Sequence, residues 1–254
     1  MASAPGSTMK KVRFVRPVLG LLAVFAAMLS YSWISLPDVR ILQKQNPQST
    51  AFMELRAREA AAESKPWRPV WRWTGYNRIS PALKRAVIVS EDAAFWGHDG
   101  LDLGELRVSI EDSVRRGVAP RGASTITQQL AKNLYLSPSY SPHRKLVELM
   151  IARRLEAELS KVRIFELYLN VIEWGDGVWG AEAASRRYFG KSASDLTVEE
   201  AALLAGAIIN PRVYSPAHPN ARLLRRKQVI LGRLGVAPSR AITPDDSADV
   251  LGAQ

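Results

Sequence analysis

The spacing of apolar and polar positions along this 254-residue chain predicts helices joined by short loops. The first apolar run, residues 17–36, carries no charged side chain, and at about 1.5 Å rise per residue it is long enough to cross the roughly 30 Å hydrocarbon core of a bilayer. Four cations precede it: Lys10, Lys11, Arg13 and Arg16. Because only scattered charges of both signs follow, the positive-inside rule places residues 1–16 in the cytoplasm and the chain from Pro37 onward outside it. We therefore expect a single transmembrane helix over 17–36.

A cleaved signal peptide is the alternative interpretation of this run. Its most apolar part, residues 18–29, has the length of a signal peptide. No clear small-x-small cleavage site precedes Tyr31 and Trp33, however, and these two aromatic residues suit the interface of a bilayer. We therefore favour the anchor and leave open whether the segment is ever cleaved.

Signals for helix starts divide the rest of the chain. Ser, Thr or Pro stands just before or at the start of apolar rows with helical spacing. These signals are found at Ser80, Ser124, Pro142, Ser160 and Thr197, and a last helix is expected over 219–234. Since no stretch alternates with period two between hairpin turns, little sheet is expected. The interpretation is a mainly α protein with a membrane-proximal linker over 37–75, a globular domain over 76–236 and a disordered tail over 237–254.

Composition narrows the chemistry. The chain has no cysteine, which excludes thiol catalysis, a disulfide framework and cysteine-containing zinc sites. Its formal charge of +11 requires an anionic partner, which nucleic acid, anionic headgroups or a phosphorylated substrate could each provide. The three histidines have no metal-ligand spacing. We expect His98 to be a structural hydrogen-bonding residue rather than a ligand.

The first candidate site runs from Glu91 to Gly100, directly after an apolar stretch over 86–89. Acidic side chains at the C-terminal end of a helix oppose its dipole, so Glu91 and Asp92 cost stability there unless a function or another partner compensates. Departures from local rules of this kind are common at functional sites. A solvated helix end is the alternative interpretation.

The second candidate site runs from Gly122 to Leu134. On a helix, polar side chains fall at i, i+3, i+4 and i+7 opposite an apolar row. They are Thr125, Gln128, Gln129 and Lys132. Free amide groups at the helix start, after Gly122, would add a site for an anion. A polar face toward solvent is the alternative, although Glu and Lys are more usual there than Thr and Gln.

The third candidate site is Arg144-Lys145-Leu146-Val147-Glu148. Glu148 shares a helical row with Ala152, Leu155 and Leu159, which would embed a carboxylate in an apolar stripe and raise its pKa unless a cation lies close. Arg144, one turn earlier, could supply that cation. A simple surface pair of this order would be worth only about 0.3 to 0.5 kcal/mol.

In these three segments the chain closely resembles family 51 of the glycosyltransferases, the peptidoglycan polymerases found alone or as one domain of class A penicillin-binding proteins. The family pattern Glu-Asp-x-x-Phe-x-x-His-x-Gly is matched by Glu91, Asp92, Phe95, His98 and Gly100. The pattern Gly-x-Ser-Thr-Ile-Thr-Gln-Gln, then Lys-Asn-Leu, is matched over 122–134, with Ala123 where a second Gly is frequent. Arg-Lys-x-x-Glu is matched by Arg144, Lys145 and Glu148, and Glu-Leu-Tyr-Leu-Asn by residues 166–170. The match covers roughly residues 80–216, and no Ser-x-x-Lys element follows, so a monofunctional member is expected.

The resemblance implies a lysozyme-like, two-lobed helical domain with a hydrophobic face that dips into the membrane. By position, Glu91 would be the general base that takes a proton from a sugar hydroxyl of incoming lipid II. That hydroxyl would attack the anomeric carbon of the lipid-linked glycan strand, invert it to a β-1,4 linkage and expel undecaprenyl diphosphate. The catalytic domain of such an enzyme would be periplasmic and anchored in the inner membrane.

The resemblance also implies the residues that bind substrate. They are Asp92, Phe95, His98, Ser124, Thr125, Gln128, Gln129, Lys132, Asn133, Arg144 and Lys145. Glu148 would be a second catalytic carboxylate, which either holds the cations in place or recruits a divalent metal, Mg²⁺ or Mn²⁺, at the diphosphate. No tightly bound cofactor is expected. The expected partners are lipid II, the lipid-linked strand, membrane lipids and other cell-wall synthesis proteins, but not nucleic acid.

Two other classes of function remain to be weighed. A lysozyme-like hydrolase or lytic transglycosylase would also use a carboxylate on glycan, but it would have no need for cations such as Lys132 and Arg144 at a diphosphate. A membrane-tethered scaffold or nucleic-acid binder would rest on the +11 charge alone. Little nucleic acid lies outside the cytoplasm, and no aromatic-basic recognition module is apparent, so the polymerase is favoured.

Overall fold

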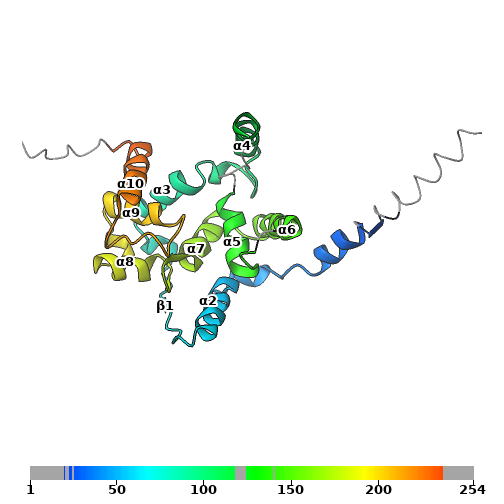
Figure 1. Cartoon of the computed structure of the whole chain (residues 1–254), viewed down its shortest axis with the longest axis horizontal. Coiled ribbons are helices and arrows are strands. Elements are labelled where there is room, and N and C mark those ends of the chain that lie inside the picture. Colours follow the sequence, from blue (N-terminus) through cyan, green and yellow to red (C-terminus); the bar gives the residue numbers. More distant parts are fainter. Residues whose placement is uncertain (1–19, 21–22, 25, 118–123, 140, 237–254) are drawn as a thin grey trace, which may run out of the picture.

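The structure is a computed structural model that describes residues 20, 23–24, 26–117, 124–139 and 141–236. This part of the chain is mainly helical, as expected from the sequence (Figure 1). The α-helices are α2 (Ala51–Ala62), α3 (Pro81–Glu91), α4 (Leu103–Arg116), α5 (Ile126–Tyr135), α6 (Pro142–Glu158), α7 (Lys161–Val171), α8 (Ala181–Phe189), α9 (Val198–Ala207) and α10 (Ala221–Arg233). Short 3₁₀ helices lie at η1 (Arg40–Gln43), η2 (Tyr76–Arg78), η3 (Phe95–Gly97) and η4 (Ala193–Asp195).

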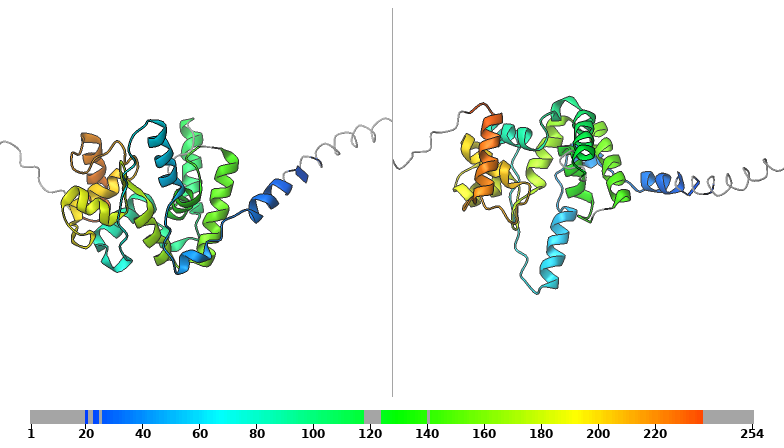
Figure 2. Two further views of the ribbon diagram at one scale, coloured as in Figure 1. Left: turned by 90° about the horizontal axis from the view of Figure 1, so that it is seen from below. Right: turned by 45° about the horizontal axis from the view of Figure 1, so that its top comes forward.

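The N-terminal segment of the described chain is helical over residues 26–34 and extends away from the helical body in Figures 1 and 2. Much of the expected membrane span over 17–36 lies outside the described residues, as do the expected cytoplasmic stretch 1–16 and the tail 237–254. Within the residues that are described, no helix combines the length and the apolar character needed to cross a membrane.

The helices form two groups joined by α7. One group packs α3 against α9 and α10, and the other packs α5 against α6, α7 and α2. In Figure 1, α8, α9 and α10 lie to one side of α7, and α5 and α6 lie to the other. Fully buried Leu83, Leu130, Leu155 and Phe165 belong to one continuous core that runs through both groups. The candidate site residues predicted from the sequence lie on α3, α5 and α6 and on the loops that flank these helices.

The segment expected to be a linker, 37–75, packs onto the domain instead of merely leading into it. Val39 and Leu42 are buried in the core. The segment also forms α2, whose far end projects from the body in the right-hand view of Figure 2. Its last part forms β1 (Val70–Trp71), which pairs in parallel with β3 (Val178–Trp179), while β2 (Glu173–Gly175) pairs antiparallel with β3 on the other side.

Asn170, at the end of α7, ties this segment to the domain. Its side chain accepts from the Thr74 amide at 2.8 Å and donates to the Thr74 carbonyl at 2.9 Å. Its main-chain carbonyl accepts from Trp71 Nε1 at 2.8 Å. Gly180 lies against the same carbonyl with φ +80°, and a Cβ there would come within 2.9 Å of it. Only glycine fits this close approach.

Candidate active site

Glu91 is the last residue of α3 and is half-buried. Two side chains donate to its carboxylate: Gln129 Nε2 at 3.1 Å and Ser90 Oγ at 3.2 Å. Burial raises the pKa of Glu91, and these hydrogen bonds and the charges of Arg226 and Lys132 oppose the rise. Glu91 is therefore a carboxylate whose affinity for a proton is increased, as a general base requires.

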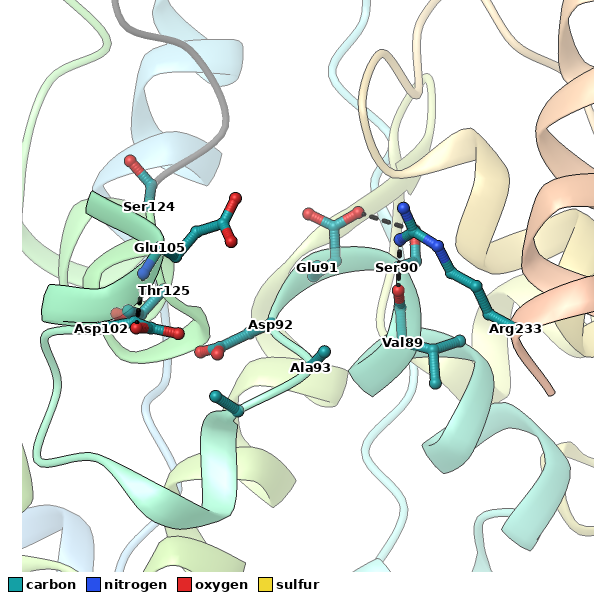
Figure 3. Close-up of a pocket in the computed structure, with 11 residues that line it drawn as sticks. Val89, Ser90, Glu91, Asp92, Ala93, Asp102, Glu105, Ser124, Thr125 and Arg233 are labelled. Carbon is teal, nitrogen blue, oxygen red and sulfur yellow. Dashed lines mark hydrogen bonds between the residues drawn. The ribbon is translucent and has the colours of Figure 1, made fainter. Parts of the chain in front are cut away.

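Glu91 faces a cavity of about 620 Å³ (Figure 3). The lining residues are Val89, Ser90, Glu91, Asp92, Ala93, Ala94, Asp102, Glu105, Ser124, Thr125 and Arg233. In Figure 3, Glu91 lies between Glu105 and Ser124 on one side and Arg233 on the other. Arg233, on α10, donates to the Val89 carbonyl at 2.8 Å and so caps the end of α3. Asp102, Glu105 and Arg233 could not be predicted from the sequence, because they belong to none of the matched motifs.

Asp92 connects α3 to α5 and is almost completely buried. It accepts from His98 Nε2 at 3.0 Å and from the Ile126 amide, at the first turn of α5, at 2.9 Å. The Gly100 amide donates to His98 Nδ1 at 3.1 Å, which places the imidazole proton on Nε2. Asp92 and His98 thus set the position of α5 next to Glu91, which fits the structural role expected of His98. The substrate contacts expected of both residues stay predictions.

Phe95 has no exposed surface and packs edge-on against Trp96 and with tilted ring planes against Phe165. The substrate contact expected for Phe95 is not supported, because its ring cannot reach a ligand from within the core. We assign it a packing role that holds the loop after α3.

Thr125 and Gln128 are also buried, with exposed fractions of 2% and 1%. Thr125 is the N-cap of α5, one residue after the start expected at Ser124, and its hydroxyl donates to the Gly100 carbonyl at 2.8 Å. Gln128 Nε2 donates to the same carbonyl at 3.1 Å. These two side chains therefore position the loop that carries His98 and Gly100, and direct contact with substrate is left to their exposed neighbour Ser124.

Arg144, Lys145 and Glu148 form one ion cluster on the first half of α6. Arg144 Nη1 donates to one oxygen of the buried Glu148 at 2.7 Å, and Lys145 Nζ donates to the other. Lys145 Nζ also donates to Gln128 Oε1 at 2.8 Å and to Ser124 Oγ at 3.2 Å. Because Ser124 lines the cavity beside Glu91, its bond with Lys145 connects the cluster to that cavity.

Arg144 retains an unused donor. Its Nε is buried and has no acceptor in the described part of the chain. A buried donor without a partner costs about 1 to 3 kcal/mol, so this atom indicates a place for an anionic ligand.

Lys132 is half-buried and lies near both Glu91 and the ion cluster. Within the described chain no carboxylate oxygen lies within 4 Å of its Nζ, which approaches the ring of Phe52 at 5.9 Å. Burial lowers its pKa, Glu148 and Glu91 raise it, and Arg144 and Lys145 lower it. The charges of both carboxylates and both neighbouring cations therefore act on Lys132.

Gln129 joins the base to a further residue that the sequence interpretation did not place in the site. Its Oε1 accepts from the hydroxyl of buried Tyr168 at 2.9 Å, and its carbonyl accepts from Asn133 Nδ2 at 2.8 Å. This fixes which end of the Gln129 amide donates to Glu91. Burial, with Glu91 and Asp92 nearby, raises the pKa of Tyr168 well above its usual value. Tyr168 lies in the matched motif Glu-Leu-Tyr-Leu-Asn over residues 166–170, and this position could have indicated that it belongs to the site.

The residues do not fit a resident divalent cation at Glu148. Both of its oxygens accept from cations. In the described ranges, no three His, Cys, Asp or Glu side chains come together as a set of metal ligands. The arrangement instead supports the other expectation for Glu148, that it holds Arg144 and Lys145 in place.

Comparison with known proteins identifies the family of this chain. The family model described as transglycosylase matches residues 61–235. A biosynthetic peptidoglycan transglycosylase of Laribacter hongkongensis is 46% identical over 219 residues, which cover 86% of this chain and 94% of the relative. The one of Nitrosomonas eutropha is 44% identical over 223 residues (88% and 90%), and that of Herminiimonas arsenicoxydans is 47% identical over 192 residues (76% and 83%). The chain therefore belongs to the transglycosylase family.

Proposed function

We propose that this transglycosylase polymerises lipid II into peptidoglycan strands with β-1,4 linkages, inverting the anomeric carbon and releasing undecaprenyl diphosphate. The observation that carries the proposal is the shared site of Glu91 and the cations of α5 and α6, joined through Ser124. A base on one side and an anion site on the other are the two groups that this transfer requires.

Glu91 acts as the general base. Its raised pKa comes from burial, while Gln129 and Ser90 hold the carboxylate in one orientation at the cavity. A base must come within about 2.6 to 3.2 Å of its proton, and a sugar hydroxyl held in this cavity can approach Glu91 from the open side. As the hydroxyl attacks, its proton passes to Glu91, and the bond from the anomeric carbon to the diphosphate oxygen breaks.

Lys132, Arg144 and Lys145 stabilise the diphosphate as it leaves. Negative charge develops on that group in the transition state, and cations already fixed in place lower its energy without reorganising. The unused Nε of Arg144 and the unpaired Nζ of Lys132 are available donors within the described chain. Glu148 acts through Arg144 and Lys145 as a positioning residue.

The mainly helical domain, with its two groups of helices, suits the lysozyme-like architecture expected of the family. Leu103, Ile110 and Val114 lie on one face of α4, and their exposed fractions are 70%, 46% and 80%. We propose that this face enters the outer leaflet of the inner membrane, where the lipid-linked substrate lies. The catalytic domain would then work at the periplasmic surface, with the N-terminal segment as its anchor.

Purified protein supplied with lipid II tests the proposal. We expect glycan strands of increasing length with wild type and nearly none with folded Glu91→Gln. The rival hydrolase or lytic transglycosylase would shorten preformed glycan and leave lipid II unpolymerised. Retained polymerisation by Glu91→Gln would contradict the assignment of the base.

A further inference from the structure

A second cavity adjoins the active-site cavity along α3. It measures about 440 Å³ and is lined by Tyr76, Pro81, Lys84, Arg85, Ile88, Val89, Trp96, Phe165, Arg233 and Leu234. Val89 and Arg233 line both cavities, so the two cavities lie next to each other there. The second cavity is therefore close to a substrate held at Glu91.

The two cavities carry opposite charges. The first is lined by the carboxylates of Glu91, Asp92, Asp102 and Glu105. The second is lined by the cations of Lys84, Arg85 and Arg233, and no carboxylate of the described chain lines it. Nor does any of these three cations form an ion pair with a carboxylate in that part of the chain. The second cavity therefore attracts an anionic group.

Aromatic side chains give the second cavity a fixed shape. Trp96 is 50% exposed, and its ring is held edge-on by Phe95 and Phe165, with centroids 5.0 and 6.1 Å away. Lys84 is held over the ring of Tyr76 at 4.2 Å and donates to the Tyr76 carbonyl at 3.2 Å. Such pre-ordered aromatic and cationic groups bind a ligand with little loss of side-chain entropy.

We propose that this cavity is a subsite for the carboxylate-bearing peptide attached to the sugars of the substrate. Arg85 and Arg233 pair with the peptide carboxylates, and Trp96 packs against the aliphatic part of the peptide. The inference rests on the proposed function, since it takes the substrate to be the peptide-bearing disaccharide. An anionic phospholipid headgroup is the competing ligand, but the lining residues shared with the cavity at Glu91 favour a group carried by the sugar.

The test pairs a change in the protein with a change in the substrate. Wild type and the double variant Arg85→Gln/Arg233→Gln are compared on lipid II with its native peptide and on lipid II whose peptide carboxylates are amidated. Each exposed ion pair contributes up to about fivefold, so amidation should raise the KM of wild type by roughly tenfold and change kcat less than about twofold. On both substrates, the double variant should have the raised KM that wild type shows on the amidated substrate.

Two further variants separate the subsite from general effects. Arg58→Gln removes a positive charge from the exposed face of α2, outside both cavities, and should leave the effect of amidation unchanged. Arg85→Gln alone leaves the hydrogen bond from Arg233 to the Val89 carbonyl intact. On a logarithmic scale, its KM for native lipid II should rise by about half as much as that of the double variant. Thermal unfolding monitored by circular dichroism checks that each variant is folded.

Equal KM values of wild type on the two substrates would overturn the inference, as would a defect of the double variant that persists in full after amidation. Loss of binding to anionic vesicles by the double variant, without any effect of amidation, would assign the cavity to lipid headgroups instead. If wild type polymerises neither substrate, the proposed function is wrong, and this outcome leaves the subsite to be decided by binding. Titration calorimetry with the lipid-free disaccharide peptide then still decides, because binding that amidation abolishes supports the subsite and absence of binding rejects it.

Discussion

Two glutamates of the site have opposite surroundings, and their roles differ for that reason. Glu91 lies at a cavity with hydrogen bonds from Gln129 and Ser90 but no ion pair in the described chain. Glu148 is buried between Arg144 and Lys145, with both oxygens occupied. The first carboxylate is placed to accept a proton from a ligand in the cavity, whereas both oxygens of the second are taken up by the cations that it holds.

The pH dependence of the reaction should reflect Glu91 and Lys132. Burial raises the pKa of Glu91, so the acid limb of kcat/KM should lie above the usual pKa of a glutamate. Burial lowers the pKa of Lys132, so the alkaline limb should begin below that of an ordinary lysine. Polymerisation of lipid II measured across pH checks both limbs. In Lys132→Arg the alkaline limb should move upward, and an unchanged limb would show that another group causes it.

The same shift predicts an effect of Glu91 on stability. Because the folded-state pKa is raised, the folded protein binds the proton more tightly than the unfolded chain, and stability falls as pH rises from the unfolded to the folded pKa. At neutral pH, Glu91→Gln should therefore be at least as stable as wild type while it loses activity. Urea unfolding at neutral and acidic pH measures this. A lower stability of the variant at neutral pH would contradict it.

Removing the carboxylate of Glu148 should have the opposite consequence for stability. Glu148→Gln leaves Arg144 and Lys145 without their shared buried anion, and breaking a buried pair of this kind costs about 3 kcal/mol. We expect lower free energy of unfolding in urea and weaker binding of diphosphate. Inorganic diphosphate should raise the melting temperature of wild type more than that of the variant, because the variant binds it more weakly. An equal thermal shift in the two proteins would contradict the role of Glu148.

At the scale of elements, the site depends on how α3, α5 and α6 meet. Asp92 bonds the end of α3 to the first turn of α5, and Lys145 bonds α6 to Ser124 and Gln128. The carbonyl of Gly100, a residue with φ +83°, accepts hydrogen bonds from Thr125 and Gln128. Most polar residues of the motifs therefore hold helices together, and fewer of them reach the substrate.

Asp92→Ala should destabilise the domain by about 3 kcal/mol, because the mutation leaves the Ile126 amide and His98 Nε2 without their buried charged acceptor. Urea unfolding gives the difference in free energy. Glu111→Ala is the matched control, since its ion pair with Arg107 is exposed and should contribute less than about 1 kcal/mol. Equal effects of the two mutations would show that Asp92 does not join the helices.

At the scale of the whole molecule, the charge of +11 and the apolar face of α4 both favour a bilayer surface. Ile110→Asp/Val114→Asp should reduce the binding of the protein to anionic vesicles by at least about tenfold, because two exposed apolar side chains on one face are replaced by anions. Flotation with vesicles at two salt concentrations measures it. Glu54→Gln on α2 is the control, and unchanged flotation of the double variant would remove α4 from the membrane surface.

Much of the fold could be predicted from the sequence because helix starts are local. Ser80 and Ser160 cap α3 and α7, and the capping box of Thr197 and Glu200 precedes α9, as expected. Helices α2, α4 and α8 were not predicted, and the packing of the expected linker onto the domain depends on distant partners such as Asn170. Such contacts are not visible in the spacing of neighbouring residues.

The helical character, the motifs and the types of side chain available for the chemistry can be predicted from the order of residues, because they depend on residues within one or two turns of each other. Which of those side chains face the cavity depends on how the helices pack. The tertiary structure buried Phe95, turned Thr125 and Gln128 toward the Gly100 carbonyl, and brought Arg233 from α10 to the end of α3. The physical reason is that burial and long-range contacts follow from the packing of whole helices, which local spacing does not specify.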